Sequence, residues 1–156
     1  MLRGALIDRL GSIALHAGLV IAAVLLGPSA AVAADPSTNA VAVYTDVQAA
    51  SGRQVYYRTC AVCHGEDLAG KVGPALTGRQ FHQMVAAQNM TAPLLFRFIA
   101  TQMPQTKPGS LTPMECTEIM AFILKRNGYP SGDTPLTTDS PDLKKIDLAA
   151  APDTGG

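Results

Sequence analysis

The five residues Cys60-Ala61-Val62-Cys63-His64 constrain this chain more than any other part of its sequence. Two thiols one helical turn apart can each form a thioether to a single porphyrin, and the imidazole that follows can ligate its iron. The pattern therefore predicts one covalently bound haem c, attached through Cys60 and Cys63, with His64 as an axial ligand of the iron.

Two other interpretations of these cysteines are open at this point. A redox dithiol of the thioredoxin kind lies at the start of a helix inside a βαβ pattern, and no such pattern of strands surrounds Cys60. A structural zinc site needs four ligands, and Cys116 and His82 lack the paired spacing typical of such sites. Haem attachment is therefore the interpretation that the surrounding sequence favours.

Haem c is normally attached outside the cytoplasm, so the motif predicts an export signal at the N-terminus. The chain carries Arg3 and Arg9, then an apolar run over residues 19–26, and then Ala31-Val32-Ala33, the A-x-A pattern of a signal peptidase site. An uncleaved membrane anchor is the alternative, but the apolar run falls well short of the ~20 residues that span a bilayer. We expect residues 1–34 to be a cleaved signal peptide and the mature protein to be periplasmic.

The remaining residues, 35–156, have the size of one small domain. They include ten Lys and Arg against eleven Asp and Glu, a balance that gives no indication of nucleic-acid binding. With two of the three cysteines assigned to haem, Cys116 is expected to be a buried thiol, and a reactive thiol or an intermolecular disulfide is the alternative. Because a domain this small buries a limited core, we expect the porphyrin to form part of it.

Apolar patterns and cap residues predict an all-α domain over residues 44–130, after a flexible segment at residues 35–43. Thr91, with Pro93 just inside the helix, and Thr112, with Glu115 three residues later, are typical N-caps. The helices are expected from Tyr44 or Thr45 to Thr59, from Arg79 to Ala87, from Thr91 to about Gln102, and from Thr112 to about Arg126.

Gly52, Tyr56 and Cys60 are spaced by four residues and share one face of the first predicted helix. A glycine there lets another helix approach closely, and an aromatic side chain one turn before Cys60 can pack beside the porphyrin. We therefore assign Tyr56 to the haem environment. The alternative for Gly52 is a glycine tolerated in an exposed helix, at a cost of about 1 kcal/mol relative to alanine.

The loop after the histidine contains Gly73-Pro74, ten residues beyond His64. A histidine that ligates a metal usually donates its other ring N–H to a carbonyl, which fixes the tautomer and makes the imidazole a better ligand. Proline restricts the geometry of its own carbonyl, so the Pro74 carbonyl is the candidate acceptor. An ordinary turn proline is the alternative.

Met103-Pro104 lies in a polar loop between two predicted helices, where core methionines are uncommon. A thioether is a soft neutral ligand that favours ferrous iron, and His/Met ligation raises the haem potential into the range used for electron transfer. We predict Met103 as the second axial ligand. The other candidates are more typical of surface or core positions: His82, Met84, Met90, Met114 and Met120.

The helix before Met103 carries an apolar stripe that is expected to face the haem, and Arg97 is expected to be solvated. From this stripe we predict Leu95 and Ile99 as haem contacts. The stripe consists of Leu94, Leu95, Phe98 and Ile99.

Four motifs occur in order over about residues 44–130: Gly52-x-x-x-Tyr56-x-x-x-Cys60-x-x-Cys63-His64, Gly73-Pro74-x-Leu76, Met103-Pro104 and Ile119-Met120-Ala121-Phe122. Together they resemble a class I bacterial monohaem cytochrome c. The resemblance implies a small all-α fold whose first and last helices cross near Gly52 and Phe122, with haem between His64 and Met103 and with Leu76 among its contacts. The chain has no tryptophan, so the indole that anchors a haem propionate in some relatives is absent.

Residues 127–130 and the tail after them are similar to cytochrome subunits and domains that serve periplasmic dehydrogenases, including quinoprotein alcohol dehydrogenases. This similarity implies an electron carrier between a periplasmic dehydrogenase and an oxidase or another cytochrome, with no catalytic residue of its own. A haem sensor with an open sixth coordination position is the alternative, and ligation by Met103 separates the two. A peroxidase would also need an open position and normally more than one haem, whereas this chain has one attachment motif.

Prolines at positions 130, 135, 141 and 152 exclude a long helix from the tail, residues 131–156. Leu136, Leu143 and Ile146 are expected to hold the tail along the domain surface, and docking to a partner is the alternative. Residues 149–156 are expected to be disordered.

Overall fold

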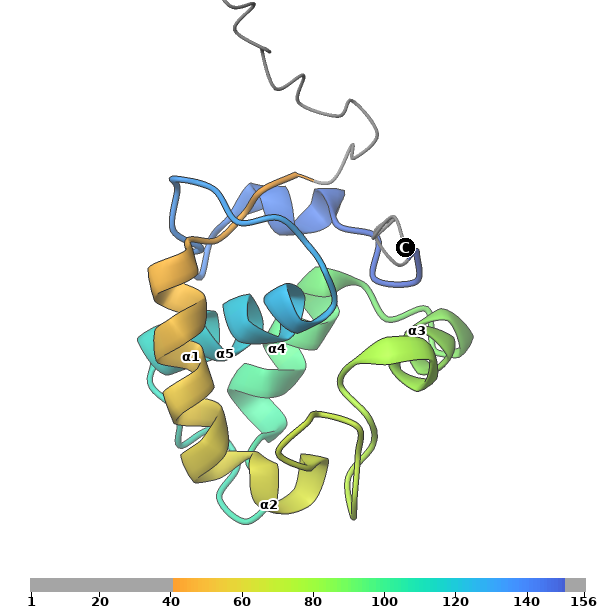
Figure 1. Ribbon diagram of the computed structural model, residues 1–156. Helices are drawn as coiled ribbons and strands as arrows, with labels where there is room; N and C mark the ends of the chain where they lie inside the picture. Colours follow the sequence, from red (N-terminus) through yellow and green to blue (C-terminus); the bar gives the residue numbers. More distant parts are fainter. Residues whose placement is uncertain (1–40, 151–156) are drawn as a thin grey trace, which may run out of the picture. The chain divides into compact units, whose positions relative to one another are not determined.

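The computed structural model describes residues 41–150, and the regular structure in this range is helical, with no strand. The predicted signal peptide at residues 1–34 and most of the segment at residues 35–43 lie outside the described residues. Within residues 41–150, five α-helices and one 3-10 helix follow one another (Figure 1). Their bounds are α1 Asp46–Thr59, α2 Ala61–His64, α3 Gly78–Ala87, α4 Ala92–Gln102, α5 Pro113–Arg126 and η1 Pro141–Lys145. The all-α prediction is confirmed.

Threonine hydroxyls begin three of these helices, as local sequence chemistry predicts. Thr91 and Thr112 accept hydrogen bonds from the backbone N–H groups of Leu94 and Glu115, at 3.3 and 3.2 Å. The Glu115 carboxylate in turn accepts from the Thr112 N–H at 2.9 Å, which completes the predicted capping box. In the first helix, α1, Thr45 is the cap. These helix starts are therefore confirmed to within one or two residues.

The long helices α1 and α5 cross at a glycine. Gly52 is buried, and a Cβ built on it would lie 1.8 Å from the Glu118 carbonyl oxygen. One turn further along α1, the Tyr56 ring packs on Phe122 of α5, with their centroids 5.4 Å apart. The crossing near Gly52 and Phe122 is confirmed, and the interpretation of Gly52 as an exposed, merely tolerated glycine is wrong.

The chain after α5 packs against the domain through apolar side chains. Leu136, Leu143 and Ile146 are buried, as the sequence predicts. Leu148 is also buried, although the sequence pattern gave no indication of it. Figure 1 shows the segment running back past the start of α1 before it forms η1. The described part of the tail is therefore a strap on its own domain.

Side chains of the domain also hold the strap through hydrogen bonds to its backbone. The Gln48 side chain donates to the Leu136 carbonyl at 2.7 Å and accepts from the Leu136 N–H at 2.8 Å. The Tyr129 hydroxyl donates to the Asp147 carbonyl at 2.6 Å. Ala149 and Ala150, expected to be disordered, have backbone N–H groups that donate to the Asp147 carboxylate, at 2.9 and 3.4 Å. Residues 151–156 lie outside the described residues.

No helix between residues 41 and 150 is both long enough and apolar enough to cross a bilayer.

Candidate haem site

The short helix α2 presents the two thiols and the imidazole of the attachment motif together. Cys60 is at once the last cap of α1 and the first cap of α2, so the two helices meet at a predicted attachment residue. Cys63 follows three residues later, and both thiols are half-buried and free. His64 ends α2 and is 9% exposed. One turn of helix therefore carries three groups that can hold a porphyrin and its iron.

The two ring nitrogens of His64 have different surroundings. Nδ1 lies 2.8 Å from the Pro74 carbonyl oxygen, which can only accept, so Nδ1 carries the proton. No hydrogen bond among residues 41–150 uses Nε2, and its lone pair is the one that a metal can take. The hydrogen bond predicted from Gly73-Pro74 is thus present, and it selects the tautomer that an iron ligand needs.

The loop that follows α2 folds back over the histidine. Gly73 donates its backbone N–H to the Cys63 carbonyl at 2.8 Å, and Gly70 donates to the His64 carbonyl at 2.9 Å. These bonds satisfy carbonyls that a helix end leaves without partners. A Cβ on Gly73 would lie 2.9 Å from Cε1 of His64, so only glycine lets the loop pass this close to the ring.

Tyr56 lies under the same turn. Its side chain is fully buried, and its hydroxyl donates to the Gly65 carbonyl at 2.6 Å. Burial raises the pKa of this hydroxyl, which keeps it protonated and able to donate. The sequence predicts Tyr56 beside the porphyrin. The contacts that the structure gives it are with Phe122 and with the residue that follows His64.

The surroundings of Cys60 differ from those of a redox dithiol. Burial raises the pKa of the Cys60 thiol, and a hydrogen bond with Thr59 opposes this in part. A dithiol that exchanges disulfides needs a lowered pKa to form its thiolate. Within the described residues, no three His, Cys, Asp or Glu side chains come together as a metal cluster would require. The geometry therefore supports neither a redox dithiol nor a structural zinc site at this motif.

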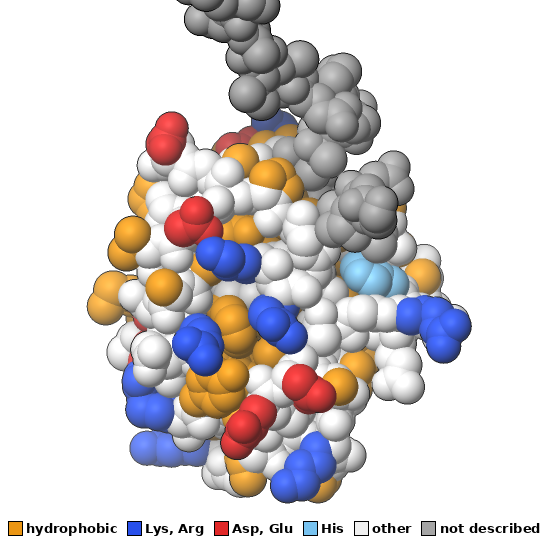
Figure 2. Space-filling view, in the orientation of Figure 1, with side chains coloured by type: hydrophobic (Ala, Val, Ile, Leu, Met, Phe, Trp, Pro, Cys, Tyr) orange, Lys and Arg blue, Asp and Glu red, His pale blue; other side chains and the backbone are white. Residues whose placement is uncertain are grey.

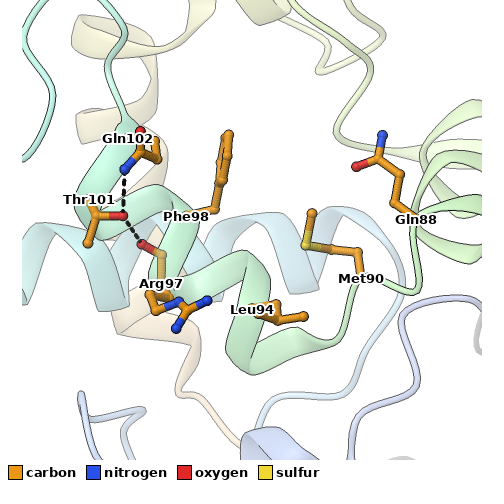
Figure 3. Close-up of a pocket in the computed structure, with 7 residues that line it drawn as sticks. All are labelled: Gln88, Met90, Leu94, Arg97, Phe98, Thr101 and Gln102. Carbon is orange, nitrogen blue, oxygen red and sulfur yellow. Dashed lines mark hydrogen bonds between the residues drawn. The ribbon is translucent and has the colours of Figure 1, made fainter.

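A cavity of about 460 Å³ opens along α4. In Figure 3 the side chains of Gln88, Met90 and Phe98 extend towards the same open space. Leu94 and Phe98, two large apolar side chains of α4, are 40% and 43% exposed. The lining residues are Gln88, Met90, Leu94, Arg97, Phe98, Thr101 and Gln102.

The apolar stripe of α4 divides between this cavity and the core. Leu95 and Ile99, predicted as haem contacts, are each 5% exposed and belong to the core cluster. Leu94 and Phe98 from the same stripe line the cavity instead. Periodicity identified the stripe, but neighbouring positions on a helix differ by 100° in direction, and the packing of α4 on α5 decides which pair faces inward. Gln88 and Met90 were missed as lining residues because they lie outside the periodic stripe.

The methionines differ sharply in their surroundings. Met103 is the half-buried cap that ends α4, directly after the cavity residue Gln102. Met90 lines the cavity at the other end of α4. Met120 is fully buried in the core, whereas Met114 is 68% exposed. Met90 therefore lines the cavity, and Met103 directly follows the last lining residue in sequence.

The remaining candidates from the sequence have other contacts. His82 Nδ1 donates to the Leu148 carbonyl at 2.8 Å and so fixes the tail strap. Met84 and Leu76 are half-buried and pack against the core cluster. Cys116 is 2% exposed, in agreement with a buried thiol, and burial raises its pKa.

Comparison with known proteins identifies the domain that carries the attachment motif. The family model described as cytochrome C oxidase, cbb3-type, subunit III matches residues 47–123, a range that begins in α1 and ends in α5. Residues 47–123 are a class I c-type cytochrome domain. The family binds haem c covalently, and the residues of α2 fit that group: two free thiols and a histidine whose Nδ1 is held by the Pro74 carbonyl, with Nε2 available.

The similarity to solved structures is weaker. The crystal structure of the sulfane dehydrogenase SoxCD from Paracoccus pantotrophus matches with a TM-score of 0.46 and 22% identity. The match covers 67% of this chain and 59% of the SoxCD chain, so this chain spans less than two thirds of that protein's length. A sequence comparison with curated proteins gives no match.

Proposed function

We propose that this cytochrome is a periplasmic one-electron carrier with a single haem ligated by His64 and Met103. The observation that carries the proposal is the His64 tautomer, because the hydrogen bond to Pro74 leaves Nε2 free on a turn that also carries two free thiols. When bound, the haem supplies the redox couple, with iron alternating between the ferrous and ferric states. The contribution of the chain is to hold two ligands that suit both states, so that little rearrangement accompanies the transfer.

Met103 is the proposed second ligand because of its place in the chain and in the fold. It ends α4, whose exposed apolar residues line the cavity, and it begins the loop that leads to α5. Cys60 and Cys63 are the proposed sites of the two thioethers. We propose Pro74 as the acceptor that orients His64, and Leu94 and Phe98 as apolar contacts in addition to the predicted Leu76, Leu95 and Ile99.

The proposed donor is a periplasmic dehydrogenase, and the proposed acceptor is an oxidase or another cytochrome. Support comes from the similarity of residues 127–130 and the tail to cytochrome subunits of such enzymes. Export through the predicted signal peptide would place the carrier in the compartment where these partners act.

Mass spectrometry of the protein purified from the periplasm tests attachment and export together. The mature chain should begin near Ala34 or Asp35 and carry the mass of one haem, which should resist extraction with acidified acetone because two thioethers hold it. A mature chain without haem, or with haem that extraction removes, would contradict the proposal.

The surface around the attachment motif carries exposed apolar side chains among charges of both signs. Val62 and Val72 are 70% and 85% exposed on either side of His64 in sequence. Residues 35–128 carry eight Lys and Arg against six Asp and Glu, and two haem propionates would cancel this excess. Figure 2 shows basic and acidic side chains interspersed on one face. We propose that partners dock through apolar contact here, with Gly65, Ala69 and the loop at residues 104–109 contributing.

Electron transfer to a redox partner should therefore depend weakly on ionic strength. Electrostatic steering accelerates association only when the protein has a strong field of one sign, and only then does added salt slow association. The second-order rate constant for oxidation, measured by stopped flow from low to high salt, is expected to change by less than about tenfold. A larger fall would mean that local patches of charge control docking.

A further inference from the structure

The backbone carbonyls at the end of α2 accept hydrogen bonds from two kinds of donor, loop N–H groups and one side-chain hydroxyl. The loop after α2 donates backbone N–H groups to the carbonyls of Cys63 and His64, at 2.8 and 2.9 Å. The next carbonyl, of Gly65, accepts a 2.6 Å bond from the Tyr56 hydroxyl, against 3.3 Å for its backbone donor, the N–H of Leu68. Its closest donor is thus a side chain from a different helix.

This donor is well placed to be rigid. Tyr56 is fully buried in α1, and its ring lies 5.4 Å from that of Phe122, next to the point where Gly52 brings α1 and α5 together. A hydroxyl on a ring held by two crossed helices has little freedom to follow its acceptor. The position of the Gly65 carbonyl is therefore set by the Tyr56 hydroxyl, and the hydroxyl does not move to follow the carbonyl.

Gly65 is a residue whose conformation needs such an anchor. Its φ is +80°, which glycine adopts readily, and glycine loses more conformational entropy on being fixed than any other residue. It directly follows His64, so any change in its backbone turns the peptide that carries the imidazole. The His64 imidazole in turn makes a 2.8 Å bond through Nδ1 to the carbonyl of Pro74, ten residues beyond His64 in the same loop.

We propose that Tyr56 is a positioning residue for His64: by fixing the Gly65 carbonyl, its hydroxyl aligns the imidazole with the Pro74 carbonyl and so sets the strength of the Nδ1–H hydrogen bond. The inference rests on the proposed function, in which His64 ligates the iron. It differs from the sequence-based role of Tyr56, which was packing beside the porphyrin. A stronger Nδ1–H bond gives the imidazole more anionic character, which favours ferric iron.

Tyr56→Phe in the holoprotein separates positioning from packing, because it keeps the ring on Phe122 and removes only the hydroxyl. The His64 Nδ1–H, followed by NMR in the diamagnetic ferrous protein, should exchange with solvent about fivefold faster, as loss of one typical hydrogen bond predicts. The reduction potential, measured by spectroelectrochemical titration, should rise, since a less anionic imidazole stabilises ferric iron less.

Tyr57→Phe is the matched control. Tyr57 is the next residue of α1 and 40% exposed, and its hydroxyl makes no hydrogen bond within residues 41–150. This variant should match the wild type in both measurements. If Tyr56→Phe also matches it, or lowers only the melting temperature, Tyr56 is a packing residue and the inference is overturned while the proposed function stands. Wild-type spectra without histidine ligation would overturn both.

Discussion

Replacing Gly52 by alanine is expected to lower the free energy of unfolding of the holoprotein by about 3 kcal/mol. The added Cβ would lie 1.8 Å from the carbonyl oxygen and 2.4 Å from the carbonyl carbon of Glu118. Both atoms belong to the backbone of α5, so no rotamer change relieves the clash, and the two helices must separate. Separation would also loosen the Tyr56–Phe122 contact one turn away. Denaturant unfolding followed by circular dichroism measures the loss.

The sign of this effect makes the test decisive. Glycine to alanine inside a helix ordinarily stabilises by about 0.5–1 kcal/mol, because alanine restricts the unfolded chain and favours the helix. Gln54→Ala, at an exposed position of the same helix, is the matched control and should change stability by less than about 0.5 kcal/mol. A Gly52→Ala protein as stable as the wild type would mean that the helices do not cross at this residue.

Replacing Met103 by alanine is expected to open the sixth coordination position. The sulfur-to-iron charge-transfer band of the oxidised protein should disappear, and the ferrous protein should bind carbon monoxide. The reduction potential should fall by on the order of 0.1 V or more, since a thioether favours ferrous iron and axial ligands set the potential over about 0.8 V. Optical spectroscopy, carbon monoxide titration and redox titration measure the three effects.

Two other methionines provide the controls. Met114 is 68% exposed on α5, and Met114→Ala should leave all three measurements unchanged. Met90 lines the cavity, and Met90→Ala should alter packing without loss of the charge-transfer band. Loss of the band in Met90→Ala, with Met103→Ala normal, would transfer the ligand assignment to Met90. Rapid carbon monoxide binding by the wild type would favour the haem sensor.

Local sequence was sufficient for the parts of this protein that depend on neighbouring residues. Thr91 and Thr112 cap their helices because each hydroxyl reaches a backbone N–H three residues away, a bond that needs no tertiary contact. The spacing of Cys60, Cys63 and His64 likewise fixes their relation within one turn of helix. The Pro74 carbonyl could likewise be predicted as the acceptor for His64, since the two residues are only ten positions apart in one loop.

Tertiary structure decided what depends on elements distant in sequence. The stripe on α4 contained both core and cavity residues, and only the packing of α4 on α5 assigned Leu95 and Ile99 to the core and left Phe98 exposed. Leu148 belongs to the core, and the His82 ring, 66 positions earlier, binds its carbonyl. Sequence periodicity identifies the apolar face of an element, whereas its contacts depend on which other element covers that face.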